Sequence, residues 1–455
     1  MQTWKSYLDS NQERFLAEFK AFLSIPSVST LPENKGDVLN AAHWLASRMT
    51  DAGLEHAEIC ETGGHPVVYA DWLHAEGAPT ILLYGHYDVQ PADPLELWQS
   101  PPFEPEVRGD RLYARGASDM KGNVLVFIHA VEAHLRTSGR LPLNVKLIVE
   151  GEEEIGSPSL PKWIEENQAK LACDYAASSD SAQISRDLPT VIVGTKGMCG
   201  LQVDIKTGGT DLHSGLAGGV VRNALHVLTD MISSMHDPDG RVTVAGFYDH
   251  VVDPSDAERQ MARRIPVSGD VFRQAIGATE LVHEPGWSVT ECTWFRPTLE
   301  VNGMWGGFQG DGTKTVIPCE AHAKITCRLA ANQDPDKIRE LIRAHILAHT
   351  PSGVEASVTP LPGKADPYLM PETHPALSAA DAALEKVKQA APIHMRMGAT
   401  VPVLGTFKNL LGVEMVSLGF SGLADGLHAP NESVDLGQFY AGGHIYCSFF
   451  EHLAK

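Results

Sequence analysis

The stretch TILLYGHYD, residues 80–88, is an apolar run that ends in a histidine and an aspartate. A second run, LNVKLIV at residues 143–149, leads in the same way into the acidic segment 150–154. Such runs predict buried parallel strands, and open α/β sheets place their active sites where these strands end. Carboxylates that converge there repel one another unless a cation lies among them, and the nearby histidine favours a divalent metal. The pattern therefore indicates a metal-dependent hydrolase.

The composition of the 455-residue chain is that of a soluble globular protein, with 43% apolar and 20% charged residues. This length predicts at least two domains. The net charge of −21 opposes binding to nucleic acid or to an anionic membrane. No window approaches the roughly 18 unbroken apolar residues of a membrane helix, and the first residues lack the apolar core of a signal peptide. The 7 cysteines are scattered without a C-x-x-C pair. We therefore expect a cytoplasmic protein with no nucleic-acid or membrane partner.

Helices and strands alternate in the first half of the chain. Residues 4–23 and 38–49 carry apolar side chains at helical spacing, and residues 121–137 predict a helix that Gly139 ends. The other predicted elements are strands at 80–84, 143–149 and 175–177 and a helix at 157–168. This succession predicts an α/β fold with a mostly parallel sheet wrapped by helices.

The pattern changes after residue 195. The elements predicted beyond it are strands at 200–206, 298–301, 321–329 and 354–358 and helices at 221–235 and 335–349, with a partly helical insertion at 240–294. They suggest an α+β domain of the split βαβ type. A loop follows at 362–367. After it, a helix at 376–389 and a strand at 413–417 resume the alternating helix and strand pattern of the first part of the chain. We therefore predict a catalytic domain formed by residues 1–195 and 364–455, interrupted by an inserted lid or dimerisation domain at 196–363.

Each candidate residue near a strand end also has a plainer interpretation. His86 and Asp88 share one face if their strand continues. Asp119 precedes the helix at 121–137 and could equally cap it. Residues 152–154 could form a solvated charge run, although they follow an apolar strand. Asp180, by itself, would be a turn residue.

Taken together, and with His428, these residues follow a known order. The chain resembles the di-zinc metallopeptidases of the carnosinase and glutamate-carboxypeptidase family, which also includes aminoacylases and succinyl-diaminopimelate desuccinylase. The resemblance runs through nearly the whole chain. The segments that carry it are 85–91 (GHYDVQP), 118–122 (SDMKG), 150–157 (EGEEEIGS), 179–180 (SD), 211–215 (DLHSG), 314–318 (KTVIP) and 426–432 (GLHAPNE).

The resemblance implies two divalent metal ions in each subunit, with zinc expected and manganese or cobalt as alternatives. It makes His86 and Asp180 ligands of one ion and Glu154 and His428 ligands of the other, with Asp119 bridging both. Mixed imidazole and carboxylate ligands suit zinc and leave room for water.

The resemblance also implies roles for residues beside the metals. Glu153 would be the general base, which requires a carboxylate near the ions but not bound to them. Asp88 would accept a hydrogen bond from the ring of His86 and so fix its tautomer. The peptide bond between Asp119 and Met120 is expected to be cis.

His213 has two interpretations. It could cap the helix that follows it, or, as the resemblance implies, it could stabilise an oxyanion in the active site of a partner subunit, which would require a homodimer. Thr315 and Arg328 match positions that contact a substrate carboxylate, for which a guanidinium is well shaped. Asn302, His374, Arg396 and Thr400 are further candidates for substrate binding.

One departure bears on the substrate. Dipeptidases of the family tend to carry Arg-Glu-Gly-Gly-Ser where residues 396–400 read RMGAT, so Met397 replaces an acidic side chain that could face a free amine. We predict a metal-dependent exopeptidase that cleaves the amide bond of dipeptides with a free C-terminal carboxylate, and an N-acyl amino acid deacylase is the alternative. Glu153 argues against a non-enzymatic binding protein, since binding needs no base. The negative charge argues against a two-metal nucleic-acid phosphodiesterase.

Overall fold

The structure is a computed structural model that describes residues 2–265, 267–422 and 425–455. The chain forms two compact units, and each combines segments that are distant in the sequence. The first contains Met1–Val193, Met370–His394 and Thr406–Lys455, and the second contains Gly194–Leu369 and Met395–Gly405. Residues 364–369 and 395–405 thus lie in the second unit, whereas the sequence pattern places all of residues 364–455 in the first.

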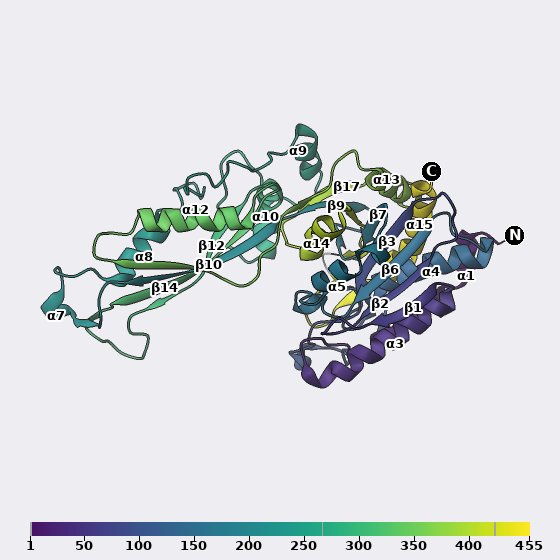
Figure 1. Cartoon of the computed structure of the whole chain (residues 1–455), viewed down its shortest axis with the longest axis horizontal. Helices are drawn as coiled ribbons and strands as arrows, with labels where there is room; N and C mark the ends of the chain where they lie inside the picture. Colours follow the sequence, from purple (N-terminus) through teal and green to yellow (C-terminus); the bar gives the residue numbers. More distant parts are fainter. Residues whose placement is uncertain (1, 266, 423–424) are drawn as a thin grey trace. The chain divides into compact units, whose positions relative to one another are not determined.

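A large sheet forms the centre of the first unit (Figure 1). Its middle strands, in the order β6-β3-β7-β18, are parallel. Antiparallel strands flank them, with β2 and β1 beside β6 and β9 beside β18. The bounds are β1 Glu55–Cys60, β2 Val67–Trp72, β3 Thr80–His86, β6 Asn144–Glu150, β7 Tyr175–Ser178, β9 Thr190–Thr195 and β18 Met415–Ser417; β16 (Tyr368–Leu369) and β17 (Ile393–Met397) also pair with β9. The predicted α/β fold is confirmed, with a parallel centre and antiparallel edges.

Short strands form two smaller sheets beside the large one. One has the order β20-β5-β4 and the other pairs β19 with β8. Their bounds are β4 Glu106–Arg108, β5 Arg111–Tyr113, β8 Ala182–Gln183, β19 Ser421–Gly422 and β20 Ser433–Asp435. β5 and β20 join segments that lie far apart in the chain.

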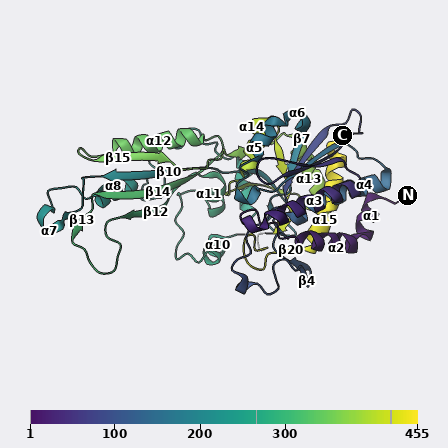
Figure 2. The ribbon, with the colours of Figure 1, turned by 60° about the horizontal axis from the view of Figure 1, so that its bottom comes forward.

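Helix α4 (Lys121–Ser138) lies in the interior of the first unit. It contacts β3 and the helices α1, α2, α3 and α15, and Figure 2 shows these helices grouped together. All of its residues from 121 to 134 are buried, as expected for a helix enclosed on several sides. Gly139 ends it with a positive φ of 69°, which confirms the predicted helix and its stop. The other helices are α1 Trp4–Ser10, α2 Gln12–Leu23, α3 Lys35–Ala52, α5 Leu160–Glu166, α6 Gln168–Leu171, α13 Pro375–Lys388, α14 Pro402–Leu411 and α15 Leu436–Leu453. Across the described residues, no helix combines the length and apolar character needed to cross a bilayer.

A buried ion cluster joins α2, α3 and α4. Arg48 donates to Glu18 at 2.8 Å and is also paired with Glu132. Nε2 of His129 lies 3.0 Å from Glu18, and Arg14 donates to Glu132 at 2.8 Å. Because each carboxylate has two or more donors, the charges are compensated inside the helical layer.

We expect this cluster to make the fold acid-sensitive. Burial favours the neutral acid, but the hydrogen bond from His129 and the charge of Arg48 outweigh it and lower the pKa of Glu18 to about 2. The resulting stabilisation is present above the unfolded value of 4.5 and is lost as the pH falls toward 2. Burial lowers the pKa of His129 to about 4, so between pH 6.5 and 4 only the unfolded chain gains that proton, which acts in the same direction.

The measurement is the thermal unfolding midpoint from pH 7 to pH 2. Glu18→Gln should reduce stability at pH 7 by on the order of 2 kcal/mol and flatten the decline on acidification. Glu13→Gln, an exposed position on the same helix, is the matched control. A Glu18→Gln variant that keeps the parent's pH dependence would contradict the expectation.

The second unit is built on an antiparallel sheet in the order β12-β14-β10-β15. Helices α8 and α12 pack on one of its faces through apolar residues such as Leu228 and Ile342. The chain order β10-α8-β12-β14-α12-β15 is the split βαβ arrangement that the sequence predicts. The bounds are β10 Gly197–Lys206, α8 Ala224–Ser233, β12 Thr298–Gly306, β14 Glu320–Leu329, α12 Pro335–Ala348 and β15 Glu355–Pro360. Helices α9 (Asp256–Arg263), α10 (Gly269–Ala275) and α11 (Val289–Phe295) account for the partly helical insertion.

Candidate metal centre

Polar side chains follow three neighbouring parallel strands of the first unit. β3 lies between β6 and β7, and the register sets His86 opposite Glu150. His86 is the last residue of β3, Glu153 lies in the turn after β6, and Asp180 comes two residues after β7. After β3 the chain first forms β6 on one side of β3 and later forms β7 on its other side. The direction in which strands are added to the sheet therefore reverses at β3. Open α/β sheets bind their ligands at such a point.

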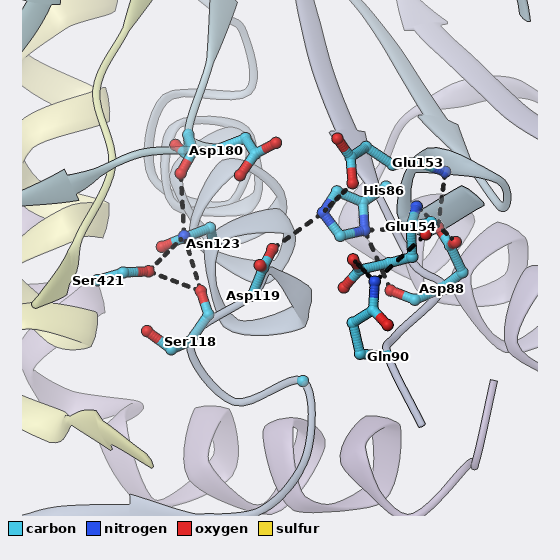
Figure 3. Close-up of polar contacts among 12 residues, drawn as sticks. His86, Asp88, Gln90, Ser118, Asp119, Asn123, Glu153, Glu154, Asp180 and Ser421 are labelled. Atoms are coloured by element: carbon cyan, nitrogen blue, oxygen red, sulfur yellow. Dashed lines mark hydrogen bonds and ion pairs between the residues drawn. The ribbon is translucent and has the colours of Figure 1, made fainter. Parts of the chain in front are cut away.

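Two groups of metal-ligating side chains share Asp119. One group is His86, Asp119 and Asp180, the other is Asp119, Glu154 and His428, and within each group the ligand atoms lie within 4.8 Å of one another. Figure 3 shows Asp119 between Asp180 and His86. Nε2 of His86 is 3.1 Å from Oδ1 of Asp119, and Nε2 of His428 is 3.0 Å from its Oδ2. The two oxygens of Asp119 therefore face different groups, as a bridging carboxylate requires.

The donor set fits divalent metal ions. Imidazole nitrogen and carboxylate oxygen are both ligands that zinc and similar ions accept. Nδ1 of His86 lies 3.0 Å from the main-chain oxygen of Asp88, which leaves Nε2 to face Asp119. Nε2 of His428 also lies 3.3 Å from Oε2 of Glu154. Carboxylates this close together repel one another without a cation among them.

Asp119 is held at the start of α4. It precedes the capping residue Met120 and so lies at the positive end of an 18-residue helix, which favours its negative charge. The peptide bond between the two residues is cis, as predicted. Asn123, in the first turn, donates to the main-chain oxygens of Ser118 at 3.3 Å and Ser179 at 2.9 Å (Figure 3). These bonds tie the start of α4 to the strand end that carries Asp180.

Asp88 differs from its predicted role. β3 ends at His86, so Asp88 does not continue the strand. The carboxylate of Asp88 lies 3.4 Å from Nδ1 of His86, farther than its own main-chain oxygen. Instead, it accepts the main-chain N–H groups of Glu153 at 3.2 Å and Glu154 at 3.1 Å. The backbone of Asp88 thus orients His86, and its side chain holds the turn that carries Glu153 and Glu154.

Burial changes the acidity of the carboxyl groups in this cluster. It raises the pKa of Glu153 to about 9, an increase that His86 opposes and Asp180 reinforces. Burial and then the charge of Asp119 raise the pKa of Asp180 to about 7. Burial also disfavours ionised Asp119, but hydrogen bonds from His428 and His86 outweigh it and lower its pKa. Glu153 therefore has the strongest tendency of the three to hold a proton, and its Oε2 is 4.0 Å from Nε2 of His86.

Gln90 is a site residue that the sequence analysis missed. Its side-chain nitrogen donates to Oε2 of Glu154 at 2.8 Å and to the main-chain oxygen of the same residue at 3.2 Å (Figure 3). It therefore helps to orient a candidate ligand. The available signal is its position, two residues after Asp88 and four after His86.

His213 and Thr315 come together in the second unit. His213 is exposed at the end of β11 (Leu212–His213), and its Nδ1 accepts the main-chain N–H of Gly215 at 3.0 Å. This bond caps α7 (Ser214–Ala217), as the plainer interpretation expects. The main-chain oxygen of Thr315 accepts the N–H of Ser214 at 3.0 Å, just before β13 (Val316–Ile317).

The second unit also brings Arg328 and Thr400 together, with Nη1 2.6 Å from Oγ1. Asn302 is exposed on β12. Arg396 is buried, pairs with Glu258 and lies 5.2 Å from the ring centre of Phe295. Because Arg396 already has an internal carboxylate partner, its predicted role in substrate binding is not supported.

His374 lies away from the metal-ligating groups. It precedes α13, where its Nδ1 accepts the main-chain N–H of Ala376 at 3.3 Å. Its ring packs edge to face against Tyr175 at 5.9 Å. Tyr175 begins β7, whereas Asp180 follows the other end of that strand. The prediction that His374 lines the pocket is therefore wrong, because His374 lies at the opposite end of the parallel strands from the metal-ligating groups.

The chain is similar to proteins of known activity. The family model described as peptidase family M20/M25/M40 matches residues 82–452. The Cys-Gly metallodipeptidase of Schizosaccharomyces pombe is 27% identical, over 98% of this chain and 97% of its own. The Beta-Ala-His dipeptidase of Homo sapiens is 27% identical, over 99% of this chain and 92% of its own.

Two solved structures are similar along almost the whole chain. An M20 family metallo-carboxypeptidase from Sulfolobus solfataricus has a TM-score of 0.82 and 33% identity and covers 97% of this chain and 99% of its own. Human carnosine dipeptidase 1 has a TM-score of 0.76 and 27% identity and covers 98% and 97%. Since the family match spans most of the sequence and includes both metal-ligating groups, the chain belongs to peptidase family M20/M25/M40 and is a metallopeptidase.

Proposed function

We propose that this chain is an exopeptidase that hydrolyses the amide bond of dipeptides with a free C-terminal carboxylate. The observation that carries the proposal is Asp119, whose two oxygens face different ligand groups while Glu153 stands beside both groups and belongs to neither. We assign two divalent ions to each subunit, zinc first, with manganese or cobalt as alternatives. His86 and Asp180 would hold one ion, Glu154 and His428 would hold the other, and Asp119 would be shared by both.

The proposed mechanism uses Glu153 as the proton carrier. Metal ions at these ligands would polarise the scissile carbonyl and make water more acidic. Glu153 takes the proton of the attacking water and gives it to the leaving amine. The carboxylate of Asp88 keeps Glu153 in place, since it accepts the main-chain N–H of that residue. The backbone of Asp88 in turn keeps Nε2 of His86 directed at Asp119.

Substrate recognition is assigned to the second unit. We propose that Arg328 and Thr400, which lie 2.6 Å apart, bind the terminal carboxylate, with Thr315 and Asn302 as further contacts. A guanidinium and a hydroxyl suit a carboxylate. The proposal is supported by the names of the relatives, which act on Cys-Gly and Beta-Ala-His dipeptides, and by the carboxypeptidase title of the Sulfolobus protein.

A deacylase is the second candidate, and Met397 is the residue that favours it. A thioether at this position offers no charge to the free amine of a dipeptide, whereas an N-acyl amino acid has no such amine. The same metal centre and carboxylate contacts would serve either substrate.

The deciding experiment compares dipeptides, longer peptides and N-acyl amino acids after chelation and after return of Zn²⁺, Mn²⁺ or Co²⁺. We expect chelation to abolish turnover, a single metal to restore it, and dipeptides to give the highest kcat/KM. Higher kcat/KM for N-acyl amino acids would assign the chain to the deacylases, and turnover that survives complete metal removal would refute the metal-dependent mechanism.

We further propose a homodimer in the cytoplasm, in which His213 stabilises the oxyanion in the partner's active site. The described cysteines are all free, as in a reducing compartment. Loss of one oxyanion donor typically costs about 10²- to 10³-fold in turnover. Mixing inactive His213→Ala with inactive Glu153→Ala should therefore restore activity, because one site of each heterodimer has both residues. No recovery after verified subunit exchange would leave His213 with its capping role alone.

A further inference from the structure

Glu432 is fully buried, and both of its carboxylate oxygens accept hydrogen bonds from the segment 115–119 of the first unit. Oε1 accepts the main-chain N–H groups of Ser118 at 2.8 Å and Asp119 at 3.1 Å. Oε2 accepts the N–H of Gly116 at 3.0 Å and a guanidinium N–H of Arg115 at 2.6 Å. A single side chain therefore fixes the backbone that leads into the shared candidate ligand Asp119.

Glu432 also belongs to the loop that presents His428. Its main-chain oxygen accepts the N–H of Ala114 at 3.1 Å, and the next residue, Ser433, donates its N–H to Asp425 at 2.9 Å. The backbone of the loop is thus fixed close to the side chain. Nε2 of His428 and Oδ2 of Asp119 are 3.0 Å apart although the residues are separated by 309 positions in the chain. Glu432 links the two segments that supply them.

Neighbouring side chains hold the same segment at a different point. Asp425 accepts the hydroxyl of Ser118 at 2.9 Å, and the hydroxyl of Ser421 donates to the main-chain oxygen of Ser118 at 2.6 Å. Both of these hydrogen bonds involve Ser118 and neither involves Asp119. Glu432 reaches the N–H of Asp119 itself, so its loss should be felt most directly at that carboxylate.

We propose that Glu432 is a positioning residue that sets the spacing between Asp119 and His428 and thereby the metal affinity of the group they form with Glu154. The proposal rests on the assignment of Asp119 and His428 as metal ligands. Residues that orient ligands without touching the ion typically cost about 10- to 100-fold in metal affinity when they are lost. Glu432 makes no direct contribution to the chemical step.

Glutamine is the informative replacement because it keeps the shape of the side chain. Its amide has one acceptor oxygen, and its NH₂ group would face N–H donors on the other side. Either the pair at Ser118 and Asp119 or the pair at Gly116 and Arg115 would then lose its acceptor. Buried donors without acceptors disfavour the arrangement that requires them.

The test titrates the metal-free full-length protein with Zn²⁺ in competition with a chromophoric chelator. In Glu432→Gln we expect the Kd of one ion to rise about 10- to 100-fold. At saturating Zn²⁺ most of kcat should return, and KM should change little, because the base and the substrate contacts are intact. Glu432→Asp keeps the charge beside Arg115 but shortens the reach, so it should also bind Zn²⁺ less tightly.

Glu132→Gln is the matched control. Glu132 is likewise buried and is bonded to Arg48 and Arg14, but it lies in the ion cluster of α2, α3 and α4. Its replacement should lower the unfolding temperature without changing the Kd for Zn²⁺. Parental Zn²⁺ affinity in both Glu432 variants, or failure of both to fold, would overturn the proposal. Asp119→Asn tells a failure of the ligand assignment from a failure of the role of Glu432. If Asp119→Asn keeps its Zn²⁺, Asp119 is not a metal ligand and the assignment fails. If Asp119→Asn loses Zn²⁺ while both Glu432 variants keep it, only the role of Glu432 fails.

Discussion

Replacement of Glu153 by alanine is expected to lower kcat by about 10²- to 10⁴-fold while both metal ions stay bound. The expectation follows from the position of Glu153, whose carboxylate is 4.0 Å from Nε2 of His86 yet belongs to neither ligand group. A side chain in that setting can accept and release a proton without giving up a metal contact.

Metal analysis and steady-state kinetics of the same preparation measure this result. Glu154→Gln is the contrasting variant, since Glu154 lies in a ligand group and its replacement should remove one ion. If Glu153→Ala loses metal and Glu154→Gln keeps it, the roles of the two neighbours are exchanged.

Asp119→Ala should be more damaging, because one side chain faces both groups. We expect the loss of both ions and a fall in kcat/KM larger than the about 10²- to 10⁴-fold expected for the general base. The reason is that Oδ1 faces His86 and Oδ2 faces His428, at 3.1 and 3.0 Å. Without the bridging charge each group retains two protein ligands, too few for a structural or catalytic zinc site.

The ion content of Asp119→Ala, measured after dialysis against metal-free buffer, tests this prediction. His394 provides a control outside the site, since His394→Gln alters a histidine that pairs with Asp381 at 2.8 Å. Retention of one tightly bound ion in Asp119→Ala would show that Asp119 does not bridge.

The sequence predicts the parts of the fold whose local pattern agrees with their final burial. β3 and β6 are dominated by apolar residues, and they are buried along almost their whole length. None of the residues of β1 is fully buried, so its pattern does not separate it from a loop. No helix is predicted over Leu436–Leu453 either. Its glycines weaken helix propensity, but Gly442 lets α15 approach α4, where a Cβ would meet Val126 at 2.9 Å.

The candidate site follows a similar rule. His86 and Asp180 end strands that are parallel neighbours, so their convergence follows from topology alone. The role of the Asp88 carboxylate depends on where β3 stops, which the apolar pattern does not define to the residue. The position of His374 depends on which end of the parallel strands the start of α13 reaches. Only tertiary structure supplies that information.

The chain passes between the two units at four places, after Val193, Leu369, His394 and Gly405. A fragment cut out at the first two would lack 395–405, whose Ala399 accepts the main-chain N–H of Lys196 at 3.0 Å. It would also lose Thr400 as the partner of Arg328. The second unit therefore cannot be exchanged between relatives as one continuous cassette. A functional chimera must receive both segments of the second unit, Gly194–Leu369 and Met395–Gly405, through four junctions. A gene that transfers only the longer segment would combine it with residues 395–405 of a different parent.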